Sequence, residues 1–194
     1  MKIEPNSTLL MIGDSVTDCG RARPVGEHWA IGDGYVSLVD GLLSAAYPDY
    51  NLRVLNTGTS GDTVLHLKER WQEDVFAHSP DWVSIMIGIN DVWRQFDRPA
   101  DSGQHVYLDQ YEQTLRHLVL DTLPKVKGLV LMTPYYMSTT VEDPMRATMD
   151  INGQVVKRIA AETGVPLVDT QAAFDRIGEH IYPATLSHGW DHVH

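Results

Sequence analysis

Residues 82–91 read WVSIMIGIND, an almost unbroken apolar run that ends in Gly88 and a short polar turn. A run of this kind is typical of a parallel strand that helices cover on both faces. Four further apolar runs of strand length occur in the chain, at residues 8–12, 52–55, 126–132 and 165–168. We therefore expect a central, mostly parallel sheet of five strands.

Segments of helical period separate these runs. Apolar residues recur at three- and four-residue steps in five places, over residues 35–46, 64–75, 107–119, 145–160 and 171–177. Trp71 lies on one of these patterns, and Trp82 begins the central strand, so we expect both rings in the core. Strands that alternate with helices predict an α/β fold with helices on both faces of the sheet. Since no linker or repeat interrupts the pattern, we expect one domain over residues 1–194.

Charge and composition narrow the range of partners. Fifteen lysine and arginine residues stand against 26 aspartate and glutamate residues, a formal net charge of −11. A chain this acidic, without a basic cluster, is a poor binder of polyphosphate, so we expect no nucleic acid and no anionic membrane as partner. We find no run of the ~18–20 apolar residues that cross a bilayer, and no secretory signal pattern. The lone Cys19 favours a reducing cytoplasm and a small buried side chain.

Polar motifs follow several of the expected strands. Ser15 comes directly after the first strand, Gly61 lies beyond the second, and Asn90 lies beyond the third. Because the carboxyl ends of parallel strands meet at one edge of a sheet, we expect these motifs to converge. Asp191 and His194, three positions apart near the end of the chain, complete the set.

Together these residues match the requirements of ester hydrolysis by a serine. Ser15 is the expected nucleophile, His194 its base, and Asp191 the acid that orients the base. The Ser15 N–H, the Gly61 N–H and the Asn90 amide are the expected oxyanion donors. Each motif alone is more often only a turn or a helix cap. Their joint occurrence, in order along the chain, favours the catalytic interpretation.

A metal site is the competing interpretation of the C-terminal residues. Four of them, His188, Asp191, His192 and His194, supply enough donors for a zinc ion. That interpretation leaves Ser15, Gly61 and Asn90 without a role, so we expect no metal and no other cofactor.

The same motifs resemble the SGNH (GDSL-type) hydrolases. Residues 12–21, 85–95 and 143–146 are more specific, and they resemble the bacterial intracellular acetylxylan esterases of that superfamily. The resemblance implies a flavodoxin-like three-layer α/β/α sandwich and a carboxylic ester hydrolase that removes acetyl groups from xylo-oligosaccharides during xylan degradation. It also implies a homo-oligomer, in some members an octamer.

Other functions are also compatible with these motifs. The superfamily includes lysophospholipases, thioesterases and esterases that act on other short acyl esters, and a non-catalytic carbohydrate-binding protein on the same scaffold is an alternative. Trp190 and Trp93 either wall the substrate pocket or pack in the core, and Asp14 is also expected near the substrate. In the family a closing helix follows the catalytic histidine. Because this chain stops at His194, we expect the natural chain to be longer.

Overall fold

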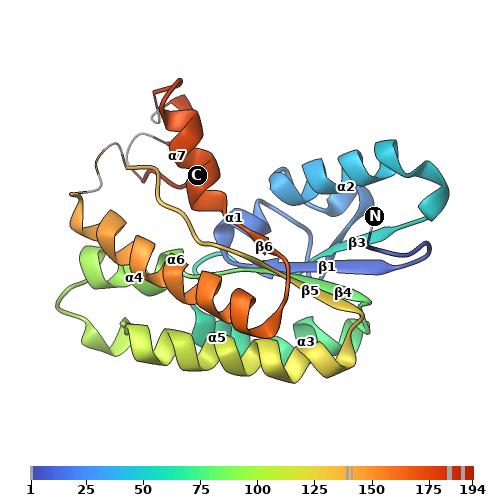
Figure 1. Cartoon of the computed structure of the whole chain (residues 1–194), viewed down its shortest axis with the longest axis horizontal. Helices are drawn as coiled ribbons and strands as arrows, with labels where there is room; N and C mark the ends of the chain where they lie inside the picture. The colour runs from blue at the N-terminus through green and yellow to red at the C-terminus, as the bar shows by residue number, and fades with distance from the viewer. Residues whose placement is uncertain (1, 139, 141, 183–184, 189–190) are drawn as a thin grey trace.

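Six strands form the central sheet of the computed structural model, which describes residues 2–138, 140, 142–182, 185–188 and 191–194 (Figure 1). The strands are β1 (Thr8–Gly13), β2 (Gly26–Glu27), β3 (Arg53–Asn56), β4 (Trp82–Met86), β5 (Gly128–Met132) and β6 (Leu167–Val168). Their order across the sheet is β2-β3-β1-β4-β5-β6. Only β2 is antiparallel to its neighbour, so the sheet is mostly parallel, as expected.

Helices cover both faces of this sheet. They are α1 (Ser15–Asp18), α2 (Tyr35–Ala46), α3 (Val64–Asp74), α4 (Ile89–Asp97), α5 (Leu108–Thr122), α6 (Pro144–Thr163) and α7 (Thr170–Gly178). Short 3₁₀ turns occur at His28–Ala30, Pro48–Tyr50, Phe76–His78, Ser102–Gln104 and Leu123–Lys125. Helices α3, α5 and α6 cover one face, and α2 and α7 lie on the other (Figure 1). The predicted three-layer α/β/α arrangement is confirmed. None of the helices described above is both long and apolar enough to cross a membrane.

The predicted strand number of five is wrong. The additional strand, β2, is two residues long and pairs antiparallel with the edge strand β3. A strand this short has no hydrophobic period, so the sequence pattern carries no signal for it. The central strand also ends earlier than the apolar run. It stops at Met86, and Gly88, with φ +139°, turns the chain into α4.

The core follows from alternation along the strands. In β1, Leu10 and Ile12 pack against the α3, α5 and α6 side, whereas Leu9 and Met11 pack against the α2 side. Trp71 and Trp82 are both buried, which confirms their predicted core positions.

Helix α2 exposes part of its apolar surface to solvent. Its extent was predicted correctly, but Leu38 and Leu42 are 67% and 70% exposed. The helical period therefore located the helix without showing that part of its apolar surface is uncovered.

The order of the parallel strands places a crevice between β1 and β4. From β1 the chain moves to β3 on one side and then crosses to β4 on the other side. In open α/β sheets, ligands bind at such a switch point, beyond the carboxyl ends of the strands. Ser15 follows β1 there, and Asn90 follows β4.

Candidate active site

Ser15 begins α1, directly after the tight turn that ends β1. Asp14 caps the helix, and its Oδ1 accepts a hydrogen bond from the Val16 N–H at 3.0 Å. Gly13 allows the turn to pack closely, because a Cβ at this position would lie 2.3 Å from the Met86 carbonyl oxygen. Ser15 is the first residue of α1, so its N–H has no partner within the helix.

The Ser15 hydroxyl, the His194 ring and the Asp191 carboxylate form a continuous chain of hydrogen bonds. The Nε2 atom of His194 lies 2.7 Å from the Ser15 Oγ, and its Nδ1 lies 2.9 Å from the Asp191 Oδ2. The other carboxylate oxygen, Oδ1, accepts the N–H groups of Val193 and His194 at 2.9 and 3.0 Å. Asp191 is 2% exposed, whereas the His194 side chain is partly open to solvent.

These hydrogen bonds decide the charge of Asp191. Burial alone raises the pKa of this carboxyl, but the two backbone N–H donors and the His194 ring outweigh burial and hold the pKa below its usual range. The carboxylate is therefore ionised at neutral pH and stabilises a positive charge on the His194 ring.

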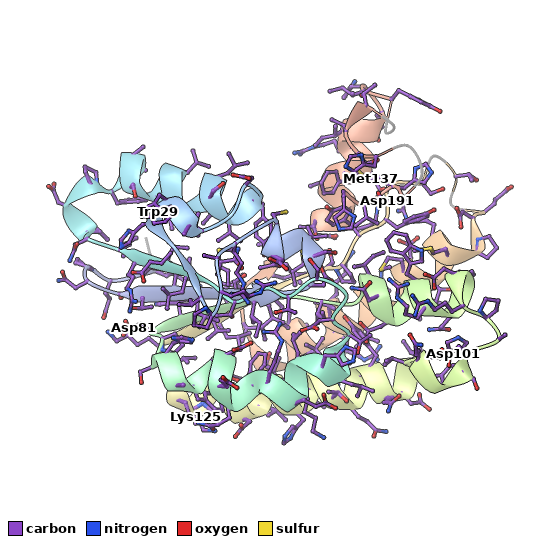
Figure 2. All side chains as sticks on the ribbon, turned by 180° about the vertical axis from the view of Figure 1, so that it is seen from behind. Trp29, Asp81, Asp101, Lys125, Met137 and Asp191 are labelled. Atoms are coloured by element: carbon purple, nitrogen blue, oxygen red, sulfur yellow. The ribbon has the colours of Figure 1, made fainter. Side chains whose placement is uncertain are left out.

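The segment that follows β5 holds residues 191–194 in place. The Tyr135 hydroxyl donates to the Val193 carbonyl at 2.9 Å, and the Met137 N–H donates to the His192 carbonyl at 2.9 Å. The buried Val193 packs in an apolar cluster with Ile89 and other side chains of α4 and α6. Figure 2 shows Asp191 beside Met137, at the opposite end of the molecule from Asp81. Packing thus brings the end of the chain onto the turn that carries Ser15.

The three predicted oxyanion donors are the Ser15 N–H, the Gly61 N–H and the Asn90 amide, and each has an N–H to offer. The Asn90 Nδ2 donates to the Asp62 carbonyl at 2.9 Å, and its Oδ1 accepts from Arg94 at 3.2 Å, so the amide has a fixed orientation with a second N–H to offer. Gly61, exposed on the loop after β3, has φ +87°, a conformation that glycine adopts without strain. In the part of the chain that the structure describes, neither the Ser15 N–H nor the Gly61 N–H meets an acceptor.

Two buried carboxyls neighbour these residues in the chain, because Asp14 precedes Ser15 and Asp91 follows Asn90. Burial, with smaller contributions from neighbouring acids, raises the pKa of Asp14 from 3.8 to about 7. Burial likewise raises the pKa of Asp91 to about 7. The Asp91 Oδ1 accepts the Val64 N–H at 3.0 Å, while its Oδ2 is buried without a partner among the described residues. Both groups bind a proton more readily than an ordinary carboxyl does.

The remaining predicted site residues are placed as follows. Asp14 is buried and lines a small cavity with Met86 and Tyr135. Trp93 is partly buried and packs against the cluster that contains Val193. Trp190 lies outside the described residues. The Cys19 thiol is half-buried, and burial together with nearby carboxylates raises its pKa, so it is a weak nucleophile.

The competing metal site is not assembled. Within the described ranges, no three His, Cys, Asp or Glu side chains are grouped to hold a metal ion. His194 instead points its two ring nitrogens at Ser15 and Asp191.

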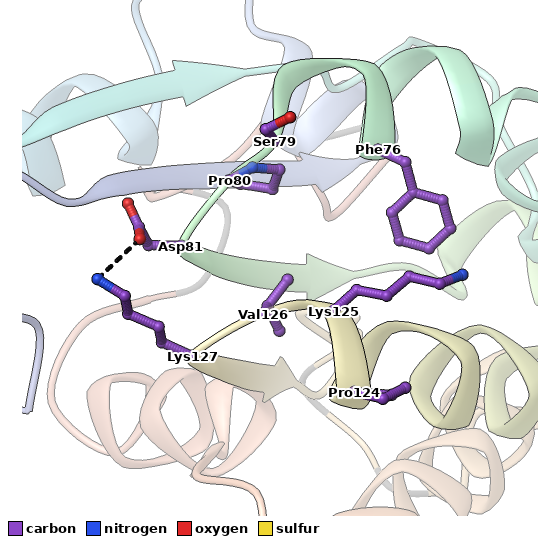
Figure 3. A pocket seen from close by; sticks show the side chains of 8 residues that line it. All are labelled: Phe76, Ser79, Pro80, Asp81, Pro124, Lys125, Val126 and Lys127. Carbon is purple, nitrogen blue, oxygen red and sulfur yellow. Dashed lines mark ion pairs between the residues drawn. The ribbon is translucent and has the colours of Figure 1, made fainter.

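A pocket at the opposite end of the sheet is separate from this site. It lies where β4 and β5 begin, and Phe76, Pro80 and Lys125 are among the residues that line it (Figure 3). Its charged groups already have partners, since Lys127 pairs with Asp81 at 3.0 Å and Lys125 pairs with Asp121 at 2.7 Å. The polar groups that can perform chemistry on an ester gather at the other end, around Ser15.

The sequence did not indicate an active-site role for Asp62 or Arg94, although both contact the Asn90 side chain. Arg94 lies four residues after Asn90 on α4. Side chains at this spacing are neighbours on a helix, so the sequence itself could have indicated this contact. The contact between Asn90 and the Asp62 carbonyl joins two segments 28 positions apart, and no local pattern indicates it.

The geometry at Ser15 agrees with similarity to known proteins. The profile of the GDSL-like lipase/acylhydrolase family matches residues 11–194. The chain belongs to this family.

An acetylxylan esterase from Geobacillus stearothermophilus is 60% identical over 196 residues, which cover all of this chain and 89% of that protein. The crystal structure of Axe2, an acetylxylan esterase from the same organism, has a TM-score of 0.97 at 60% identity, with 100% and 89% of the two chains covered. LAE5, an alpha/beta hydrolase from the metagenome of Lake Arreo in Spain, is 48% identical, with a TM-score of 0.96 and the same coverage. Catalytic mutants of Axe2 with solved structures are D191A, H194A and S15A. This GDSL-like chain has the same residue types at those three numbers.

Proposed function

We propose that this protein is a serine esterase that removes O-acetyl groups from xylo-oligosaccharides. One observation carries the proposal: the Ser15 Oγ, the His194 ring and the Asp191 carboxylate form one hydrogen-bonded chain. The 60% identity to an acetylxylan esterase supports the choice of substrate.

The first half of the reaction forms an acetyl-enzyme. The His194 Nε2 accepts the proton of the Ser15 hydroxyl while the Oγ attacks the acetyl carbonyl carbon. The carbonyl oxygen becomes an oxyanion, which accepts hydrogen bonds from the N–H groups of Ser15 and Gly61 and from the Asn90 amide. The bond to the sugar oxygen then breaks, and that oxygen leaves with the proton from His194.

The second half releases acetate. His194 takes a proton from water, and the resulting hydroxyl oxygen attacks the acetyl carbon. The new oxyanion occupies the same donors and collapses, so that the Ser15 Oγ leaves and recovers its proton from His194. Asp191 stays ionised in both halves, since its hydrogen bonds hold its pKa low, and it stabilises the imidazolium that forms each time.

The surroundings of the site fit a neutral, hydroxyl-rich substrate. A groove beside Gly61 is lined by polar side chains that include His66, Glu69 and Gln104, which can exchange hydrogen bonds with sugar hydroxyls. The net charge of −11 disfavours polyanionic substrates. As parts of the same proposal, Trp190 and Trp93 wall the substrate pocket, and Asp14 lies beside it.

The test is hydrolysis of 4-nitrophenyl acetate and of acetylated xylo-oligosaccharides, with longer acyl esters for comparison. We expect the wild type to release acetate from the oligosaccharides and Ser15→Ala to abolish this activity, while the exposed Ser79→Ala retains it. Activity that survives Ser15→Ala contradicts the mechanism. A preference for longer acyl chains contradicts the substrate and favours another acylhydrolase activity of the family.

Apart from the substrate and water, the proposed steps use only side-chain and backbone groups of this chain. We therefore expect treatment with EDTA to leave the rate unchanged. Loss of activity that zinc restores would favour the metal site of His188, Asp191, His192 and His194 instead.

We also propose that the protein is a cytoplasmic homo-oligomer, octameric as in some members of the family that it resembles. Exposed apolar side chains support self-association: Trp29 is 97% exposed, and Leu38 and Leu42 lie one turn apart on α2. Analytical ultracentrifugation tests this point. A monomer at micromolar concentration contradicts it, as does an oligomer that Leu38→Glu and Leu42→Glu leave intact.

A further inference from the structure

The guanidinium of Arg70 joins separate segments at the carboxyl edge of the sheet. Arg70 lies on α3, and its side chain is 16% exposed. Its Nε donates to the Asp62 Oδ2 at 2.6 Å, and its Nη2 donates to the Gly13 carbonyl at 3.1 Å. Its Nη1 donates to the Thr57 carbonyl at 2.7 Å and also to the Asp74 carboxylate. One side chain thus contacts the ends of β1 and β3 and the loop before α3.

Two of these contacts, with Gly13 and Asp62, lie close in the chain to a proposed oxyanion donor. The Gly13 carbonyl lies two residues before the Ser15 N–H, and Asp62 directly follows Gly61. The Asp62 carbonyl accepts the Asn90 amide at 2.9 Å, so Asn90 is also linked to Arg70 through one residue. Arg70 itself contacts none of the reacting groups that the mechanism uses.

The chemistry of arginine suits this task. A guanidinium has N–H donors in a rigid planar fork, so bonds in different directions fix the relative placement of their acceptors. Lysine offers a single flexible ammonium and cannot reach the same acceptors at once. The positive charge is balanced by Asp62 and Asp74, both of which it contacts. Burial raises the pKa of the Asp62 carboxyl, and the charge of Arg70 partly opposes this rise.

We propose that Arg70 is a positioning residue that sets the relative placement of the three oxyanion donors. This inference rests on the proposed function, because the donors matter only if an oxyanion forms at Ser15. Oxyanion stabilisation depends on donors that are placed before the reaction begins, so small displacements reduce the rate without affecting ground-state binding equally.

The test compares Arg70→Lys and Arg70→Met with the wild type in two assays. The first measures kcat and KM for 4-nitrophenyl acetate. The second measures the inhibition constant of an alkylboronic acid, which forms a tetrahedral adduct on a catalytic serine and so reports on the oxyanion donors. We expect kcat to fall by about 10- to 100-fold and the inhibition constant to rise by a similar factor, with KM changed by less than about threefold.

A matched control distinguishes a change in the placement of the oxyanion donors from a general loss of folding stability. Arg116 also bridges two elements, pairing with Glu112 on α5 and Glu162 on α6, and neither partner belongs to the proposed active site. We expect Arg116→Lys to keep the wild-type kcat and inhibition constant. Partial unfolding lowers the apparent kcat but leaves the inhibition constant of the remaining active molecules unchanged. A fall in kcat without a rise in the inhibition constant therefore overturns the proposal, as does wild-type kcat in Arg70→Lys.

A second variant serves if the Arg70 variants do not fold. Asp62→Ala removes the link between Arg70 and the loop while leaving the contacts of Arg70 with Gly13 and Thr57. We expect the same coupled change in kcat and inhibition constant, and an unchanged inhibition constant contradicts the proposal. Failure of the proposed function looks different, because it shows in the wild type, which would then release no acetate from the oligosaccharides, or in Ser15→Ala, which would then stay active.

Discussion

The Nε2 atom of His194 lies 2.7 Å from the Oγ of Ser15, although 179 positions separate the two residues in the chain. Asp191 continues this contact on the far side of the ring, at 2.9 Å from Nδ1. His194 lies on the turn that begins at Asp191, and hydrogen bonds from Tyr135 and Met137 hold this turn in place. Catalysis therefore depends both on the reacting groups and on the segments that place them.

Replacement of Asp191 by asparagine tests the orientation of the base. The amide of Asp191→Asn presents an N–H to the His194 Nδ1 and so favours the tautomer that cannot accept the Ser15 proton. We expect kcat for 4-nitrophenyl acetate to fall by about 10⁴-fold with little change in folding. Asp121→Asn, at an exposed ion pair with Lys125, is the control and keeps its activity. A loss below tenfold argues against the triad.

Asn90→Ala removes one oxyanion donor. We expect kcat to fall by about 10²- to 10³-fold while KM stays close to that of the wild type. Asn152 is a buried asparagine on α6 and makes a suitable comparison, since Asn152→Ala perturbs packing without touching the site. If both variants lose activity equally, Asn90 is a structural residue only.

Gly61→Ala tests the Gly61 N–H as an oxyanion donor, because alanine disfavours the backbone conformation that places this N–H. A Cβ at Gly61 meets no atom within 4 Å, so the effect arises from φ +87°, where an L-residue costs about 1 kcal/mol. Gly164 offers the same situation away from the site, with φ +72° at the end of α6 and open space around its Cβ. We expect similar losses of thermal stability in the two alanine variants but a reduced kcat only in Gly61→Ala. Equal kcat values speak against the Gly61 N–H as a donor.

The buried carboxyl of Asp91 predicts a pH-dependent stability. Burial raises its pKa from 3.8 to about 7, so between these values the folded protein holds a proton that the unfolded chain releases. The free energy of unfolding therefore falls as pH rises through this window, and the loss is complete above pH 7. Asp91→Asn removes the ionisation and keeps an oxygen that can accept the Val64 N–H.

Urea denaturation at several pH values measures this effect. We expect Asp91→Asn to gain stability relative to the wild type as pH rises from 4 to 7, reaching on the order of 2–4 kcal/mol. The exposed Asp109→Asn provides the comparison and shows no such trend. A stability difference that is independent of pH contradicts a protonated Asp91.

Local patterns in the chain predict much of this fold. Apolar runs and helical periods place five of the strands and the helices α2, α3, α5, α6 and α7 close to their observed positions. These signals are local, because side-chain spacing along a strand or helix decides which face is apolar. The two-residue strand β2 and the exposed Leu38 carry no such signal, since each depends on what lies beside it in space.

The candidate site likewise combines features that the sequence determines with features that only packing determines. By itself the sequence determined that a serine, a glycine and an asparagine follow three strands, and that an aspartate and a histidine lie one turn apart. Only the tertiary structure decided that His194 meets Ser15, that Asp62 and Arg94 hold Asn90, and that Arg70 joins the ends of β1 and β3. The reason is physical: residue types and short spacings are properties of the chain, whereas hydrogen bonds between distant segments and the burial that shifts a pKa exist only after packing excludes water around them.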